Sequence, residues 1–391
     1  MNSNFSLVTT IKSSKIFYTF YYYIGSFVAN ILKCFVRADD KLILFVSYGG
    51  RNLGDSPKVI YESMLKDSRF DKYKMAWAFL APQKYDLKKG EKIKINSIGY
   101  LIKALKARVW ITNVDMRRGL SFDGKHTLRI NTWHGTAIKH LGKDCKDGAQ
   151  EFNTKVKRPI GDVLLAQGQY DVDIFSKAFG MNPENILITG LPRNDELAKK
   201  NNFSFIEKLK KEMGLPLDKK IILYAPTFRE SKGVHSWAQQ QPLNLDKWEK
   251  SLSDDYLLIM RGHVIVNKLH GVVESNFVKD YSNYQNLNDL LLVSDILISD
   301  YSSIMFDYSI LERPIICYAY DYDQYVKDRG VYFDIRNELH SVSDEDSLIE
   351  TIRKMDYKLE KRHAIEFKNK YIKEYGNASN KVLDLIYQTI S

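Results

Sequence analysis

The chain has 391 residues, of which 44% are hydrophobic and 27% are charged. This length exceeds one ordinary domain and fits two, and the composition excludes disordered, collagen-like and coiled-coil chains. Lysine and arginine outnumber aspartate and glutamate by 58 to 48, so an anionic partner is expected, such as nucleic acid, nucleotide phosphates or an anionic membrane surface. Cys34, Cys145 and Cys317 form no CxxC motif, which disfavours a disulfide framework or a zinc site.

An uncharged, aromatic-rich segment lies near the N-terminus, between Lys15 and Lys33. It is short for a membrane span, which needs about 20 apolar residues, and it lacks the A-x-A pattern of a cleaved signal peptide. Aromatic residues with flanking lysines are typical of a helix that lies in one leaflet. We therefore predict a membrane-associating helical segment over residues 1–38. A helix buried against the protein itself and a single membrane span are the alternatives.

From residue 39 onward, short apolar runs alternate with helical patterns, which predicts parallel β-sheets with right-handed crossovers. A polar stretch, 196–220, separates two such series. The predicted fold is therefore α/β, with two doubly wound Rossmann-like domains, 39–200 and 201–391, that face each other across a cleft. Closing helices are expected at about 344–355 and 358–391. The expected strands are 41–48, 75–80, 109–112, 128–133, 163–166, 186–190, 221–224, 256–260, 295–299 and 314–318.

Polar side chains gather just after several expected strands, where sheets of this kind bind ligands. His134 follows one strand and suits general-base chemistry, although a structural histidine is the alternative. Arg261 and His263 follow another strand and could clamp a phosphate. The segment Ser299-Asp300-Tyr301-Ser302-Ser303 precedes an apolar helix and either binds an anion or caps that helix.

Two more expected strand ends carry cations, Arg193 beside Asn194 and Arg229 after Thr227, for which surface ion pairs are the alternative. No GxGxxG follows a strand and no GxxxxGK[ST] occurs, so nicotinamide and P-loop chemistry are unsupported. No HExxH or carboxylate cluster points to a dedicated metal.

Taken in order, these segments resemble the teichoic-acid glycerophosphotransferases, the CDP-glycerol:poly(glycerophosphate) glycerophosphotransferase family. The likeness runs from about residue 41 to about 334 and is to the shorter enzymes of the family. The motifs that carry it are Trp133-His134-Gly135-Thr136 with Lys139, Gly190-Leu-Pro-Arg-Asn-Asp195, Tyr224-Ala-Pro-Thr-Phe-Arg229, Arg261-Gly-His263, and Ser299-Asp-Tyr-Ser-Ser-Ile-Met-Phe-Asp307 with Arg313-Pro314-Ile315.

The resemblance implies a GT-B-like fold with an acceptor domain followed by a CDP-donor domain. It also implies peripheral attachment to the cytoplasmic face of a bacterial membrane, and no metal or other cofactor. The donor would be CDP-glycerol. The acceptor would be an undecaprenyl-diphosphate-linked saccharide or a growing polyol-phosphate chain of teichoic acid or capsule, and CMP would be released.

By matched position, the resemblance makes His134 the catalytic base and His263 a second catalytic residue, and it assigns the other residues to the two substrates. The donor diphosphate would lie against Arg261, His263, Ser302 and Ser303. The remaining donor-side residues would be Thr227, Arg229, Asp300, Arg193 and Asn194. Gly135, Thr136 and Asp55 would lie on the acceptor side.

Two alternatives stay open. The motifs contact phosphate and nucleotide rather than the polyol, so CDP-ribitol or another CDP-polyol is an alternative donor. A non-catalytic, membrane-associated binder of anionic polymer is the alternative from another class. A nucleic-acid partner is not expected, because the basic residues are dispersed and no nucleic-acid module is recognised. The oligomeric state, including a homo-oligomer, is left open.

Overall fold

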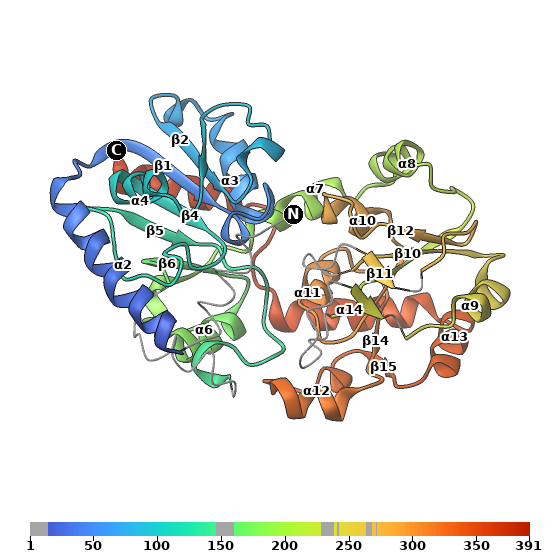
Figure 1. The fold of residues 1–391 in the computed structure, drawn as a ribbon. Coiled ribbons are helices and arrows are strands. Elements are labelled where there is room, and N and C mark those ends of the chain that lie inside the picture. The colour runs from blue at the N-terminus through green and yellow to red at the C-terminus, as the bar shows by residue number, and fades with distance from the viewer. Residues whose placement is uncertain (1–14, 146–159, 228–237, 241, 263–267, 271) are drawn as a thin grey trace.

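The computed structural model describes residues 15–145, 160–227, 238–240, 242–262, 268–270 and 272–391. Two parallel β-sheets form the centres of two domains that lie side by side (Figure 1). The first sheet has the strand order β3 (Glu91–Lys94), β2 (Lys74–Phe79), β1 (Asp39–Val46), β4 (Ala107–Thr112), β5 (Leu128–Asn131), β6 (Val163–Ala166) and β7 (Ile186–Ile188). The second has the order β12 (Val278–Asp280), β10 (Tyr256–Met260), β8 (Lys220–Tyr224), β13 (Ile296–Ser299), β14 (Ile315–Tyr318) and β15 (His340–Val342).

The predicted α/β fold with two parallel sheets is confirmed, and the central strands match the predicted apolar runs. These strands are buried on both faces, so their side chains alternate between two cores. In β1, Ile43 and Phe45 pack into one core, whereas Leu42 and Leu44 pack into the other. The edge strands β3, β12 and β15 were not predicted, because they are short and mostly polar.

Helices cover the faces of both sheets. Those of the first domain include α3 (Asp55–Met64), α4 (Ile98–Lys106) and α6 (Gln169–Phe179). The N-terminal helix α2 and the C-terminal helix α15 are described below. The other helices are α7 (Asp195–Lys200), α8 (Phe203–Glu212), α9 (Leu245–Leu252), α10 (Leu287–Val293), α11 (Ile304–Ser309), α12 (Tyr322–Arg329), α13 (Glu345–Arg353) and α14 (Tyr357–Tyr371). A small parallel pair, β9 (Ala238–Gln240) and β11 (Lys268–His270), stands apart from the two main sheets.

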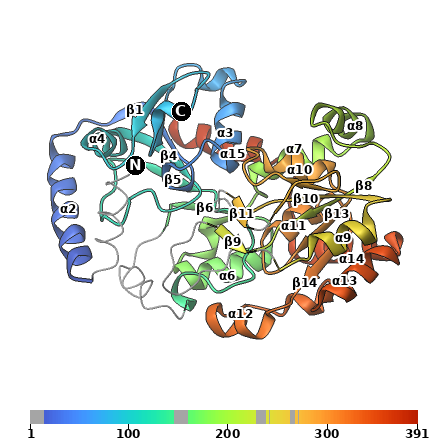
Figure 2. The same ribbon diagram turned by 45° about the vertical axis from the view of Figure 1, so that its right-hand side comes forward.

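The C-terminal helix α15 (Ala378–Ile390) returns to the first domain and lies beside α3 (Figure 2). Val382, Leu383 and Ile386 pack into the same core as β1. The single closing helix predicted over 358–391 is therefore wrong: the helix ends at Tyr371, and Gly376, at φ +83°, precedes α15. The predicted second domain, 201–391, includes this helix, but the structure packs it against the first sheet.

The N-terminal helix α2 (Lys15–Phe35) lies along the outer side of the first domain (Figure 1). Asn30 Nδ2 donates to the Ser121 carbonyl at 2.8 Å, and the Ser121 N–H donates to Ser26 Oγ at 2.8 Å. Ala29 is fully buried in the domain core. The opposite face is apolar and exposed, and its large side chains are Ile16, Phe17, Phe20, Tyr23, Ile24, Phe27, Val28, Ile31 and Phe35.

Within the described part of the chain, α2 included, no helix is long and apolar enough to cross a membrane. The alternative of a helix packed against the protein itself is confirmed for one face of α2, and the membrane association stays a prediction. One face is packed against the protein, and the other face is open and hydrophobic.

We predict that Ile386→Ala lowers the free energy of unfolding of the first domain by about 2 to 5 kcal/mol, because it leaves a cavity in the core shared with β1. Urea unfolding followed by circular dichroism measures this change. Gln388→Ala, at an exposed position of the same helix, is the matched control and should change stability by less than about 0.5 kcal/mol. Equal effects of the two substitutions would contradict the packing of α15 described above.

Candidate active site

A cleft of about 1230 Å³ lies between the two domains, and its walls come from both. Many of the sequence-predicted site residues line it: Asp55, His134, Gly135, Thr136, Arg193, Thr227, Arg261, Ser302 and Ser303. Asn194 and Asp300 are buried behind the wall. His263 and Arg229 lie outside the described residues.

His134 is held on the first-domain wall by the loop that follows β5. Its Nδ1 lies 2.8 Å from the Asn113 carbonyl oxygen. A carbonyl oxygen only accepts, so Nδ1 carries the proton in this contact and Nε2 keeps a lone pair. No hydrogen bond to Nε2 occurs among the described residues. Burial lowers the pKa of His134 below its ordinary 6.5, so the ring is neutral at pH 7 and Nε2 can accept a proton.

Gly135 brings this loop into contact with the second domain. Its φ is +134°, a value that side chains rarely allow, and a Cβ atom there would lie 2.6 Å from Ser303 Cβ. Only glycine fits between the two domains at this point. His134 and the Ser302-Ser303 turn are therefore held close together although 168 residues separate His134 from Ser302 in the sequence.

Ser303 occupies the N-cap position of α11, yet its hydroxyl makes no capping hydrogen bond. The capping alternative considered from the sequence therefore does not explain Ser303, whereas Ser302 Oγ accepts from the Ile304 N–H at 3.4 Å, as that alternative expects. Arg261 enters the cleft from the end of β10, and its Nη1 donates to the Tyr281 carbonyl at 3.0 Å and to the Tyr284 carbonyl. Burial lowers the pKa of Arg261, although that pKa starts so high that the side chain keeps its positive charge.

Arg193 joins the two domains. Its Nη1 donates to Asp55 Oδ2 at 3.0 Å and to the His134 carbonyl at 2.9 Å, and its Nη2 donates to Asp307 Oδ2 at 2.5 Å. Burial alone would raise the pKa of Asp55, but Arg193 and the Tyr48 hydroxyl lower it below the ordinary 3.8. The structure thus gives Arg193 two carboxylate partners, one from α3 and one from α11.

Three other predicted residues make buried hydrogen bonds inside the protein. Asn194 Nδ2 donates to Asp307 Oδ1 at 2.7 Å, and Thr136 Oγ1 donates to Asp171 Oδ2 at 3.1 Å. Asp300 Oδ1 accepts from the Thr227 N–H at 2.8 Å. These contacts position the cleft walls, and the predicted substrate contacts of these residues stay predictions.

Sequence reasoning missed four residues of this network. Tyr48 and Asn113 follow β1 and β4, so the strand-end argument that found His134 applies to them as well. Asp171 lies within α6, where burial raises its pKa to about 7, and Asp307 lies within α11. Asp171 carries no local sequence signal, and Asp307 appears only as the last residue of a longer motif.

The part of the chain that the structure describes contains no group of three or more His, Cys, Asp or Glu side chains able to hold a metal ion. The expectation of a reaction without metal or cofactor stays a prediction.

Comparisons with known proteins identify the family. The model of the CDP-Glycerol:Poly(glycerophosphate) glycerophosphotransferase family matches residues 28–388. The chain is 31% identical over 376 residues to a teichoic acid glycerol-phosphate transferase of Staphylococcus aureus, covering 89% of this chain and 93% of that protein. It is 39% identical over 315 residues to a teichoic acid poly(glycerol phosphate) polymerase of Staphylococcus epidermidis, covering 76% of this chain but only 43% of the relative.

Solved structures agree with this result. A structure of the wall teichoic acid polymerase TagF, a histidine-to-asparagine variant soaked with CDPG, matches with a TM-score of 0.83 at 33% identity, covering 93% of this chain and 92% of that chain. The family match spans nearly all of both domains, and the motifs that carried the resemblance fall within it. The chain therefore belongs to the CDP-glycerol:poly(glycerophosphate) glycerophosphotransferase family.

Proposed function

We propose that the protein transfers glycerol phosphate from CDP-glycerol to a hydroxyl group of a membrane-linked saccharide or polyol-phosphate chain in teichoic-acid synthesis, and releases CMP. The observation that carries the proposal is the placement of a neutral His134, with Nε2 unengaged, beside Gly135, the residue at which this loop contacts Ser303 of the second domain. Family membership and the names of the relatives support the choice of donor and product.

In the proposed reaction the acceptor oxygen attacks the β-phosphorus of CDP-glycerol. A new oxygen–phosphorus bond forms while the bond from the β-phosphorus to the bridging oxygen breaks, and CMP leaves with that oxygen. His134 Nε2 takes the proton of the attacking hydroxyl. The Asn113 carbonyl then stabilises the imidazolium, because it already accepts the Nδ1 proton.

Negative charge that gathers on the leaving phosphate has to be met by the second domain. Arg261 supplies a cation that is oriented by two backbone carbonyls, and Ser302 and Ser303 supply hydroxyl groups. His263 and Arg229 are proposed to add to this side on the strength of the family motifs alone. The proposal needs no resident metal, so transfer is expected to persist in excess chelator. We also propose that the two domains face each other as in the GT-B fold.

We predict that His134→Asn lowers kcat by about 10²- to 10⁴-fold, the usual contribution of a positioned general base. CMP release with CDP-glycerol and a lipid-linked acceptor measures this, with CDP-ribitol as the comparison donor. His126→Asn is the matched control, since His126 is an exposed histidine of the same domain whose positive φ suits asparagine. Near-normal turnover in His134→Asn would remove this residue from the role.

The pH profile follows from the same geometry. Because burial lowers the pKa of His134, its base form persists to more acidic pH than an exposed histidine would allow. The acidic limb of kcat/KM should therefore fall with an apparent pKa below 6.5, and activity should be flat through neutral pH. An acidic limb well above that value would contradict the assignment of His134 as the base.

We further propose that α2 holds the protein at the cytoplasmic face of the membrane by its exposed apolar face. The helix is fixed to the domain by Asn30 and Ser26, so its outward side chains form a preordered surface. Partial insertion of aromatic and aliphatic side chains into the headgroup region is favourable without a membrane span.

We predict that Phe20→Ser with Phe27→Ser weakens binding to anionic lipid vesicles by at least about tenfold, since each phenylalanine would bury apolar area in the bilayer. Both are more than 60% exposed, so the fold should not change. Vesicle cosedimentation measures the effect. Phe203→Ser on α8 is the control, because Phe203 is equally apolar and 82% exposed but far from α2 in the sequence. Unchanged sedimentation of the double variant would place the membrane contact elsewhere.

A further inference from the structure

Two arginines, Arg51 and Arg118, line the first-domain side of the cleft. Both guanidinium groups lie over Gly49, which has a φ of +63°. A Cβ atom at Gly49 would lie 2.6 Å from Arg118 Nη1 and 3.4 Å from Arg51 Nη1. The absence of a side chain at Gly49 therefore leaves room for two like charges to stand next to each other.

The pair differs in its partners from Arg193 in the cleft and from the neighbouring Arg117. Arg193 is matched by Asp55 and Asp307, and Arg117 by Asp123. Arg51 Nη1 instead donates to the Tyr48 carbonyl at 3.0 Å, and Arg118 Nε donates to Asn96 Oδ1 at 3.0 Å.

No carboxylate of a described residue forms an ion pair with either member of this pair. Burial, together with the charge of Arg118, lowers the pKa of Arg51. Among the described residues, two cations thus stand side by side on the cleft wall without a paired carboxylate, an arrangement that attracts an anion.

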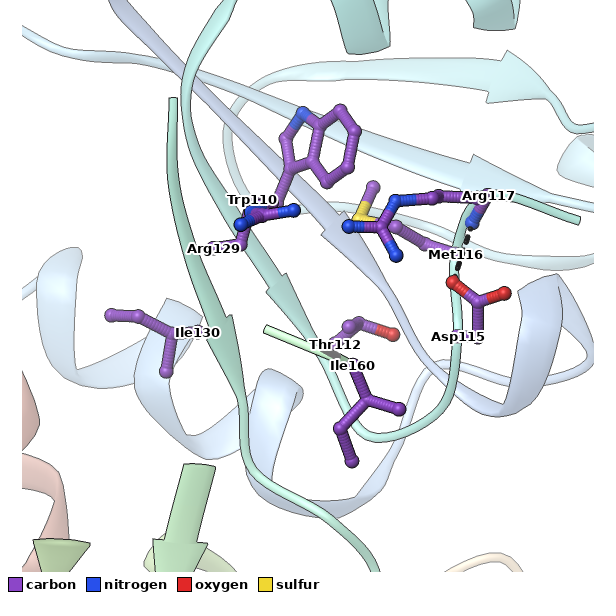
Figure 3. A pocket seen from close by; sticks show the side chains of 8 residues that line it. All are labelled: Trp110, Thr112, Asp115, Met116, Arg117, Arg129, Ile130 and Ile160. Atoms are coloured by element: carbon purple, nitrogen blue, oxygen red, sulfur yellow. Dashed lines mark hydrogen bonds between the residues drawn. The ribbon is translucent and has the colours of Figure 1, made fainter. Parts of the chain in front are cut away.

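The loop that carries Arg118 is anchored in the first domain by its neighbouring residues. Met116 is buried in the domain core, and the Arg117 side chain points into a small pocket of about 10 Å³, which is too small for a ligand (Figure 3). Arg117 Nη2 donates to Asp123 Oδ1 at 2.9 Å. Arg118 follows with a φ of +59°, a backbone conformation that non-glycine residues rarely adopt, and its side chain lines the cleft instead.

The same loop is in contact with α2. The Tyr21 hydroxyl donates to the Arg118 carbonyl at 3.1 Å, and the Tyr18 hydroxyl donates to the Gly119 carbonyl at 3.4 Å. On its other side the pair reaches the catalytic wall, because the Tyr48 carbonyl that binds Arg51 belongs to a residue whose ring lies 6.0 Å from the His134 ring. The arginine pair therefore stands between the exposed apolar helix and the proposed base.

We propose that Arg51 and Arg118 form a phosphate-binding subsite for the acceptor. The inference rests on the proposed function. Guanidinium forks match the oxygens of phosphate esters, and two adjacent forks suit one phosphate group or a diphosphate. An acceptor of the proposed class carries such groups at two places, in its lipid diphosphate and in the phosphodiesters of its chain.

The test compares Arg51→Gln, Arg118→Gln and the double variant with Arg362→Gln. Arg362 is exposed on α14, has no ion pair or hydrogen bond among the described residues, and controls for the loss of one positive charge. KM is measured for CDP-glycerol and for two acceptors: a soluble glycerol-phosphate oligomer without lipid, and a short-chain prenyl diphosphate saccharide. Binding of the oligomer without donor is measured by titration calorimetry, and thermal unfolding checks that each variant folds.

In the double variant, KM for the acceptor should rise by at least about tenfold while KM for CDP-glycerol stays within about twofold, because each lost guanidinium–phosphate contact weakens binding. The acceptor that responds identifies the phosphate source. A rise with the oligomer assigns the chain phosphodiester, and a rise with the prenyl substrate assigns the lipid diphosphate. The Arg118→Lys variant should bind the acceptor more tightly than Arg118→Gln but less tightly than the wild type, since lysine keeps the charge but lacks the forked guanidinium group.

The proposal is overturned if both acceptor KM values match those of Arg362→Gln. It is also overturned if only binding to anionic vesicles falls, because the pair would then contact bulk lipid headgroups. A wild-type protein that binds CDP but transfers to neither acceptor would reject the proposed function and, with it, this subsite. Normal turnover with unchanged acceptor KM would reject the subsite alone.

Discussion

The guanidinium group of Arg193 lies almost buried between two carboxylates that come from different domains. Asp55 begins α3 of the first domain, to which Arg193 also belongs, and Asp307 lies in α11 of the second, so the ion pair with Asp307 links the two domains. Removing one partner of such a buried arrangement typically costs about 3 to 5 kcal/mol, because the remaining charges are left uncompensated. The contact of Gly135 with Ser303 depends on the same spacing of the domains. The relative position of His134 and the Ser302-Ser303 turn is thus fixed by charge as well as by packing.

In the proposed reaction each domain binds one substrate. The first domain supplies the base, the arginine pair over Gly49 and the helix with an exposed apolar face, which are proposed to act on a membrane-linked acceptor. The second domain supplies Arg261 and the serine turn, which are proposed to bind the nucleotide. The loop 116–121 links the outer helix to the cleft, since α2 binds its carbonyls while Arg118 lines the cavity. In our proposal this short segment of backbone therefore links the membrane-facing helix to the acceptor side of the cleft.

The strands could be predicted from the sequence because parallel strands covered on both faces appear as short, continuous apolar runs. β6 and β10 match the predicted ranges residue for residue. The return of α15 to the first domain could not be predicted. Its apolar face packs into a core whose β1 residues lie more than 300 positions earlier in the chain, and no local pattern identifies which core it joins. The apolar N-terminal helix was predicted, but its one-sided packing depends on hydrogen bonds to residues 118–121.

The residues of the candidate site could likewise be predicted only in part from the sequence. His134, Ser303 and Arg261 were found because each follows a strand, and the topology of parallel sheets brings such positions together. Arg193 was also found in this way and was interpreted as a donor ligand. Its carboxylate partners lie 138 and 114 residues away in the chain, so nothing in its surroundings in the sequence indicates them.

The most direct test measures kcat and the affinity for CDP separately in the Arg193→Lys variant. The lysine keeps a positive charge but cannot bind both carboxylates and the His134 carbonyl at once. If Arg193 positions the domains, kcat falls by about 100-fold or more while the affinity for CDP, measured by calorimetry, changes by less than about twofold. If kcat at saturating donor is normal and only the affinity for CDP is lost, Arg193 is a donor ligand and the central claim is wrong.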